Sequence, residues 1–177
     1  VARAVARSID EAPTVTSVDL SRNELNTECA IALADSMRDL LESGRVVRPC
    51  VVRSCAVAHN PEIGSEGGAE LLGALATTGT QTINLADEDT NYGTSITSAI
   101  EMNYTLQWLD LANNGLSPEC GIGFSAALRE NPAIACLCMA HNGLDHLAGF
   151  AIAEKLSGEG TGRGPDTQVR FMNLAHN

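Results

Sequence analysis

The chain has 177 residues, of which 44% are hydrophobic and 3% aromatic, and its formal net charge is −11 at pH 7. This length suits one ordinary domain with a real core. Polar or charged residues interrupt every apolar stretch well short of the roughly 18 residues that indicate a membrane span. The negative charge argues against nucleic acid as a partner, because phosphate recognition needs a basic patch.

One motif recurs along the whole sequence. Each copy places mostly apolar residues at positions 1, 4 and 6, and five of the six copies place asparagine at position 9. The alternation predicts a short strand with one buried face, and the spacing between copies leaves room for an amphipathic helix after each strand. We expect strand segments at 15–25, 52–63, 80–90, 106–116, 134–144 and 169–177. The helices between them are expected at 29–44, 67–79, 94–103, 119–131 and 147–158.

The asparagine at position 9 follows each predicted strand, where the chain must turn. An amide side chain can donate to and accept from the backbone groups that a turn leaves unpaired. We therefore expect a structural column of asparagines through the stacked repeats. Its members are Asn23, Asn60, Asn114, Asn142 and Asn177, and Glu88 takes the place in the third copy.

Capping residues mark several of the predicted helix ends. Ser117 precedes Pro118 and Glu119, which together form a start signal, and Ser65 and Asp145 stand at comparable places. Glycine is favoured just after a helix. The expected stops are Gly44, Gly79 and Gly158.

The segments VTSVDLSRNEL (15–25) and LQWLDLANNGL (106–116) resemble the leucine-rich repeat family, in its long-repeat, ribonuclease-inhibitor-like class. The resemblance implies an α/β fold, a right-handed leucine-rich repeat solenoid (horseshoe) with a parallel concave β-sheet and convex α-helices. We expect one leucine-rich repeat domain over 1–177. Its expected parts are the helix of a preceding repeat at 1–12, repeats at 13–49, 50–77, 78–103, 104–131 and 132–166, and the start of a further repeat at 167–177.

The ends and the longest spacings of the repeat also carry information. Neither end supplies the polar cap that a solenoid needs, and the first residues form no signal peptide. We therefore expect the chain to be a fragment of a longer array. The two longest spacings come from insertions at 43–49 and 158–165, which fall on one edge of the predicted horseshoe and are either a recognition edge or tolerated loops.

Side chains between the apolar anchors of each strand should face away from the core. One such column reads Ser17, Ser54, Thr82, Trp108, Cys136, Phe171, and the next reads Asp19, Ala56, Asn84, Asp110, Cys138, Asn173. Exposed aromatic residues beside a carboxylate are typical of binding hot spots. Alternatively, a flanking segment of a longer protein covers them. The expected partner-binding residues are Trp108, Asp110, Cys136, Cys138, Phe171 and Asn173, with His141 and His176 at the rim.

Chemical alternatives are weaker. His141, His176 and Cys138 offer zinc-ligand types, yet no tetrahedral set is evident. The acidic segment 87–93 imitates a calcium loop but breaks the EF-hand pattern. A phosphate loop requires glycines that follow a strand and precede Lys-Ser/Thr. The glycines of 158–165 meet neither condition. We expect no metal, no cofactor and no catalytic residues.

Cysteine usage and one short motif bear on the compartment. The six cysteines form no CxxC pair and no framework typical of secreted domains, so we expect free thiols. The glycosylation sequon at Asn103 is short enough to occur by chance. These features favour an intracellular protein.

The sequence therefore predicts a non-catalytic protein-protein interaction module or scaffold subunit. We expect it to bind a partner protein on the concave face and one loop edge, with a basic surface on that partner as one option, and to bind neither nucleic acid nor membrane. The resemblance extends to inhibitors, innate immune receptors, actin regulators and axonemal subunits, and the sequence selects none of them. We expect a larger assembly, for example a cytoskeletal or axonemal one, and a cytoplasmic location, with a cytoskeletal or ciliary one as an option. The alternative function is a GTPase-activating protein resembling the Ran GTPase activator.

Overall fold

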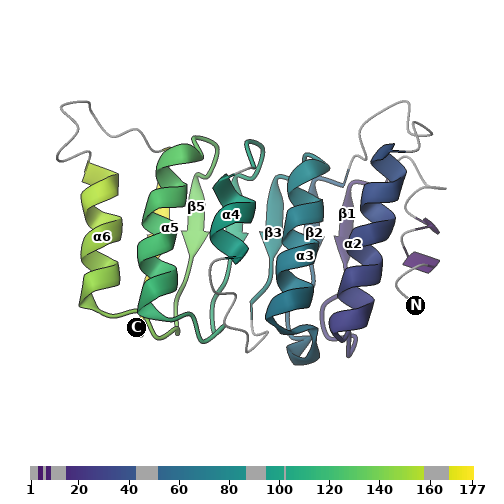
Figure 1. Ribbon diagram of the computed structural model, residues 1–177, viewed down its shortest axis with the longest axis horizontal. Helices are drawn as coiled ribbons and strands as arrows, with labels where there is room; N and C mark the ends of the chain where they lie inside the picture. Colours follow the sequence, from purple (N-terminus) through teal and green to yellow (C-terminus); the bar gives the residue numbers. More distant parts are fainter. Residues whose placement is uncertain are drawn as a thin grey trace.

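The computed structural model describes residues 4–5, 7–8, 15–42, 52–86, 95–101, 103–157 and 168–177, and helices and strands alternate along them (Figure 1). The predicted insertions at 43–49 and 158–165, the acidic segment 87–93 with Glu88, and the helix stops Gly44 and Gly158 lie outside the described residues. In chain order the elements are β1 (Ser17–Asp19), α2 (Thr27–Glu42), β2 (Ser54–Ala56), the 3-10 turn η1 (Pro61–Ile63), α3 (Gly64–Thr77), β3 (Thr82–Asn84), α4 (Ser95–Glu101), β4 (Trp108–Asp110), α5 (Pro118–Glu130), β5 (Cys136–Cys138), α6 (His146–Ser157) and β6 (Phe171–Asn173).

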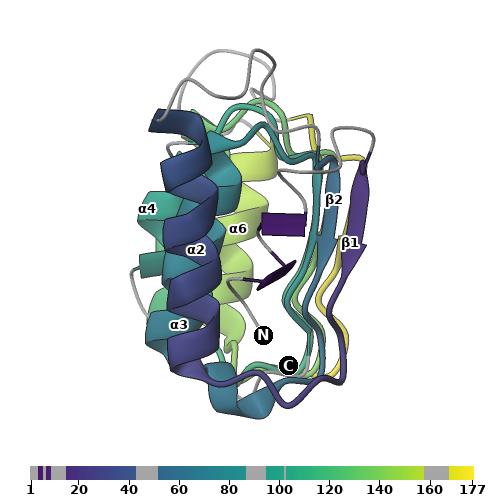
Figure 2. The same cartoon turned by 90° about the vertical axis from the view of Figure 1, so that its right-hand side faces the viewer.

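The six strands form one sheet in the order β1-β2-β3-β4-β5-β6, and every neighbouring pair is parallel. The helices lie in a single layer against one side of this sheet (Figure 2). The arrangement confirms the predicted α/β solenoid. We call the side of the sheet opposite the helices the open face, which corresponds to the predicted concave face.

The strand alternation predicted from the sequence is correct. The middle residue of each strand points toward the helices, and Ile83, Leu109 and Leu137 are fully buried there. Aliphatic residues from the helices, among them Leu33, Leu72 and Leu75, complete the core. Thin aliphatic layers of this kind need few aromatic residues.

The predicted helix starts are only partly correct. Asp145 caps α6, since its Oδ1 accepts the N–H groups of Leu147 and Ala148 at 2.9 Å. Ser117 stands at the cap position of α5, but its hydroxyl contacts Cys120 Sγ at 3.5 Å and no cap hydrogen bond forms. Ser65 lies inside α3, because η1 adds a turn before that helix.

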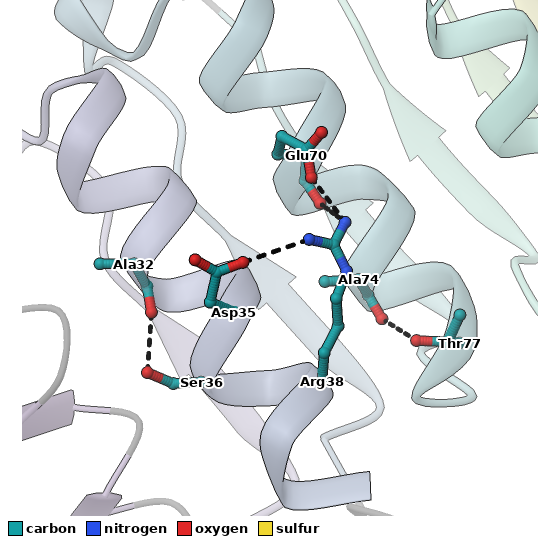
Figure 3. Close-up of polar contacts among 7 residues, drawn as sticks. All are labelled: Ala32, Asp35, Ser36, Arg38, Glu70, Ala74 and Thr77. Atoms are coloured by element: carbon teal, nitrogen blue, oxygen red, sulfur yellow. Dashed lines mark hydrogen bonds and ion pairs between the residues drawn. The ribbon is translucent and has the colours of Figure 1, made fainter. Parts of the chain in front are cut away.

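Polar contacts join the outer surfaces of α2 and α3 (Figure 3). Arg38 Nη2 lies 2.7 Å from Glu70 Oε2 and also donates to the Glu70 carbonyl at 3.2 Å, while Arg38 Nη1 lies 3.4 Å from Asp35. These groups are partly exposed, so solvent screens the ion pairs and each contributes little stability.

Candidate functional site

A buried asparagine links the turns of neighbouring repeats. Asn60 Oδ1 accepts the backbone N–H groups of Asn23 at 2.9 Å and Leu25 at 3.0 Å, both from the preceding repeat. Its Nδ2 donates to the carbonyls of Leu20, again in the preceding repeat, and of Val57 in its own. One side chain therefore satisfies backbone groups of two successive turns.

The same pattern recurs toward the C-terminal end. Asn142 Oδ1 accepts from the N–H groups of Asn114 and Leu116 at 2.8 and 3.0 Å. Asn177 Oδ1 accepts from those of Asn142 and Leu144, each at 3.2 Å. This hydrogen-bonded column holds the strand ends in register and so fixes the spacing of the side chains on the open face.

The residue before each asparagine of this column has left-handed backbone geometry, which sequence reasoning missed. The φ angles are 60° at Arg22, 61° at His59, 55° at Asn113, 54° at His141 and 58° at His176. Non-glycine residues rarely adopt this conformation. The recurrence of His and Asn at this position was the available signal, because Asn and His tolerate it better than most residues do.

The rim histidines lie together, as their position in adjacent repeats predicts. The rings of His141 and His176 stack with their centroids 4.3 Å apart and an interplanar angle of 15°. Within the described residues, no group of three or more His, Cys, Asp or Glu side chains is placed to hold a metal ion.

The six other predicted partner-binding residues lie side by side on the open face. Trp108, Cys136 and Phe171 are register partners on β4, β5 and β6, and Asp110, Cys138 and Asn173 form the next register row. The side chain of Phe171 is 55% exposed. The other five are partly exposed.

The acidic and amide residues of this second row also have a structural role. Asp110 Oδ1 accepts the N–H of Ala112 at 3.0 Å, and Asn173 Oδ1 accepts that of Ala175 at 3.0 Å. Asp19 Oδ1 accepts the N–H of Ser21 at 2.9 Å, and Asn84 Oδ1 accepts that of Ala86 at 3.0 Å. Each of these side chains therefore satisfies a backbone N–H just after its strand while it remains on the open face.

Cys138 lies between Asp110 and Asn173 in this row. Burial, the largest influence, raises the pKa of its thiol. The charge of Asp110 and a hydrogen bond to its side chain raise this pKa further, whereas hydrogen bonds involving the Ala140 backbone and Asn173 lower it. Because the thiolate is the reactive form, the raised pKa disfavours nucleophilic chemistry at Cys138.

The charge is unevenly divided between the two sides of the described chain. The strand and turn segments 15–24, 52–60, 80–86, 106–115, 134–143 and 168–177 contain three acids (Asp19, Glu24, Asp110) and three arginines (Arg22, Arg53, Arg170). The helical segments 27–42, 61–79, 95–101, 116–133 and 144–157 contain twelve acids and three bases. The acidic excess therefore lies on the helical side, and the net charge gives no reason to expect a basic partner at the open face.

The sequon asparagine is buried. Asn103 is 1% exposed, and its Oδ1 accepts the N–H groups of Thr105 at 2.8 Å and Leu106 at 2.9 Å. Asn131, one repeat later, has an equivalent role: its Oδ1 accepts from Ala133 at 2.9 Å and its Nδ2 donates to the Asn103 carbonyl. The sequon therefore belongs to a second set of structural asparagines, at the helix-to-strand edge, and its nitrogen is inaccessible to glycosylation.

Comparison with known proteins agrees with this architecture. A sequence model of the Leucine Rich repeat family matches residues 11–34, which contain β1 and the first half of α2. This match and the stacked strand-helix repeats support a leucine-rich repeat protein, and domains of this kind generally act as protein-interaction modules. No curated protein matches the sequence. No helix in the described segments is long and apolar enough to cross a membrane.

Proposed function

We propose that this chain is a non-catalytic interaction module that binds a partner protein on its open face, with Trp108 and Phe171 as the main contacts. The observation that supports this most directly is the position of these two aromatic side chains. They lie in one register row, on the side of the sheet that the described helices leave uncovered. Solenoids commonly bind partners on this side.

The local composition also supports a binding role. Aromatic residues make up only 3% of the chain, and leaving a large apolar side chain in water forgoes about 1.5–3 kcal/mol of burial free energy. Aromatic residues are enriched among interface residues that contribute most to affinity. Two of them in one row are more easily explained by a partner than by folding.

The rest of the set extends this contact surface. Asp110, Cys136, Cys138 and Asn173 surround the aromatic pair, and the stacked pair His141 and His176 extends it to the rim. The surface would bind its partner as a rigid body, since the asparagine column fixes the strands beneath it.

The broader setting is also part of the proposal. Full helices of 16, 14, 13 and 12 residues in four repeats favour the long, ribonuclease-inhibitor-like class. We assign the chain a scaffold role within a larger assembly, of which a cytoskeletal or axonemal one is an example. Only the family resemblance supports that setting, and no specific observation favours the GTPase activator.

The test is the double variant Trp108→Ala with Phe171→Ala. Immobilised wild-type and variant chains are incubated with extract of the source cells, and the captured proteins are quantified by mass spectrometry. We expect proteins captured by the wild type to be depleted at least about tenfold with the variant, at unchanged melting temperature. Phe150→Ala is the matched control, because Phe150 is 69% exposed on α6. Equal capture by both variants and the wild type would refute the proposal.

A further inference from the structure

The open face places a carboxylate beside the partly exposed Trp108 and the exposed Phe171. Trp108 and Asp110 share β4, and Phe171 lies two strands away on β6. We propose that these three residues bind an arginine side chain of the partner protein, with the guanidinium group directed toward Asp110. The inference rests on the proposed function and specifies the chemistry that the open face recognises.

The spacing of the aromatic residues fits one flat group. Neighbouring strands lie about 4.8 Å apart, so the backbones beneath Trp108 and Phe171 are about 9–10 Å apart. Between them stands Cys136, whose side chain is small. A guanidinium group or its methylene stem, touching a ring on each side at about 3.5–4 Å, needs about 7–8 Å. The strand spacing therefore matches a single flat layer between two side chains that stand upright on the sheet.

Asp110 supplies the charge for this position. It lies two residues after Trp108 on the same face of the strand, about 6–7 Å along it. Its Oδ1 is held by the Ala112 N–H at 3.0 Å, which fixes the orientation of the carboxylate. A carboxylate has about four acceptor positions, so sites remain for a guanidinium, which can both stack on aromatic rings and bond a carboxylate.

The neighbouring charges favour this orientation. Asp110 is the single acidic side chain in 106–115, 134–143 and 168–177, and Arg170 is the single arginine. Arg170 comes one residue before Phe171. Along the strand direction it therefore lies on the side of the aromatic row that faces away from Asp110. Asp110 attracts a bound cation toward its own end of the face. The stem of the guest arginine should therefore enter from the Arg170 side.

Trp108 makes the proposal directly measurable, because the chain contains one tryptophan and its fluorescence reports this site alone. The probe is N-acetyl-arginine methylamide. Its control is N-acetyl-citrulline methylamide, which has nearly the same shape but no charge. We expect a saturable change with the arginine probe at millimolar concentration, and binding at least about threefold weaker with citrulline.

The charge is tested by Asp110→Asn. Asn84 and Asn173 accept the equivalent backbone N–H in this same chain, each at 3.0 Å, so the substitution should preserve the turn. We expect the variant to bind the arginine and citrulline probes equally. The matched control is Asp19→Asn, the same register column on β1, which should keep the wild-type preference.

Three results would overturn the inference: no saturable response to the arginine probe, equal binding of both probes by the wild type, or an arginine preference that survives Asp110→Asn. None of these results refutes the proposed function by itself. If the double aromatic variant still loses its partner proteins, the open face binds a protein by other chemistry. If partner capture survives that variant, the proposed function fails.

Discussion

The backbone N–H of Asn114 donates to Oδ1 of Asn142 at 2.8 Å, so the residue that organises one turn is itself held by its counterpart in the next repeat. Asn142 donates in the same way to Asn177 at 3.2 Å, and Asn23 to Asn60 at 2.9 Å. Successive turns are thereby coupled through side chains as well as through the sheet. In a solenoid, where each repeat contacts only its neighbours, such links are the means by which stability passes along the array.

Asn60→Ala should therefore be strongly destabilising. The asparagine is fully buried and serves N–H groups of Asn23 and Leu25 as well as carbonyls in two successive repeats. Removing it leaves several buried polar groups unpaired, at an expected cost of about 2–4 kcal/mol in the free energy of unfolding. Urea denaturation measures this cost. The exposed Gln107→Ala is the control, and a loss no larger than that of the control would contradict the structural role of the column.

The strands were predictable from the sequence because their signal is local. A period of two residues assigns each side chain to one face, so Leu109 inside and Trp108 outside follow from the pattern alone. The asparagine column was predictable for a related reason, since its spacing recurs in register with the strands.

Contacts that depend on backbone geometry were not predictable in the same way. The role of Asp110 in closing its strand end depends on where the Ala112 N–H points, and the stacking of His141 on His176 depends on the left-handed turn. The start of α3 was missed because η1 adds a turn that no repeat pattern marks. The uneven division of charge became visible only once the helices and strands were placed on opposite sides.

Two glycines at equivalent positions of neighbouring helices should respond oppositely to the same substitution. A Cβ added at Gly121 on α5 would lie 2.6 Å from the Ala148 Cβ, whereas one added at Gly149 on α6 meets nothing within 4 Å. Alanine favours a helix over glycine by about 1 kcal/mol. We expect Gly149→Ala to raise the melting temperature and Gly121→Ala to lower it, because α5 and α6 must separate. A stabilising Gly121→Ala would mean that these helices pack less closely than described.

The left-handed turn before Asn142 can be tested with two variants of His141. Both His141→Gly and His141→Val remove the stacked ring, so they differ mainly in backbone preference. Glycine adopts a φ of 54° freely, whereas a β-branched residue is strained there. We expect the glycine variant to be more stable than the valine variant by about 1–2 kcal/mol, measured by urea denaturation. Equal stabilities would argue against the left-handed conformation at this position.

Cys55 should make the stability of the chain sensitive to alkaline pH. The side chain is 1% exposed in the middle of β2, and burial, with a smaller contribution from the charge of Asp19, raises the pKa of its thiol from 9.0 to about 12. The folded state therefore holds the proton more tightly than the unfolded state. The resulting stability is complete below pH 9 and is lost progressively as the pH rises toward 12.

Cys55→Val removes this titration while keeping an apolar side chain of similar size. Between about pH 8 and about pH 10, we expect the wild type to lose about 1 kcal/mol more of its unfolding free energy than the variant does. Other alkaline groups titrate in both proteins, so the difference between the two urea-denaturation series isolates Cys55. Parallel series would show that this thiol ionises in the folded state as easily as in the unfolded chain, which its burial beneath the open face does not permit.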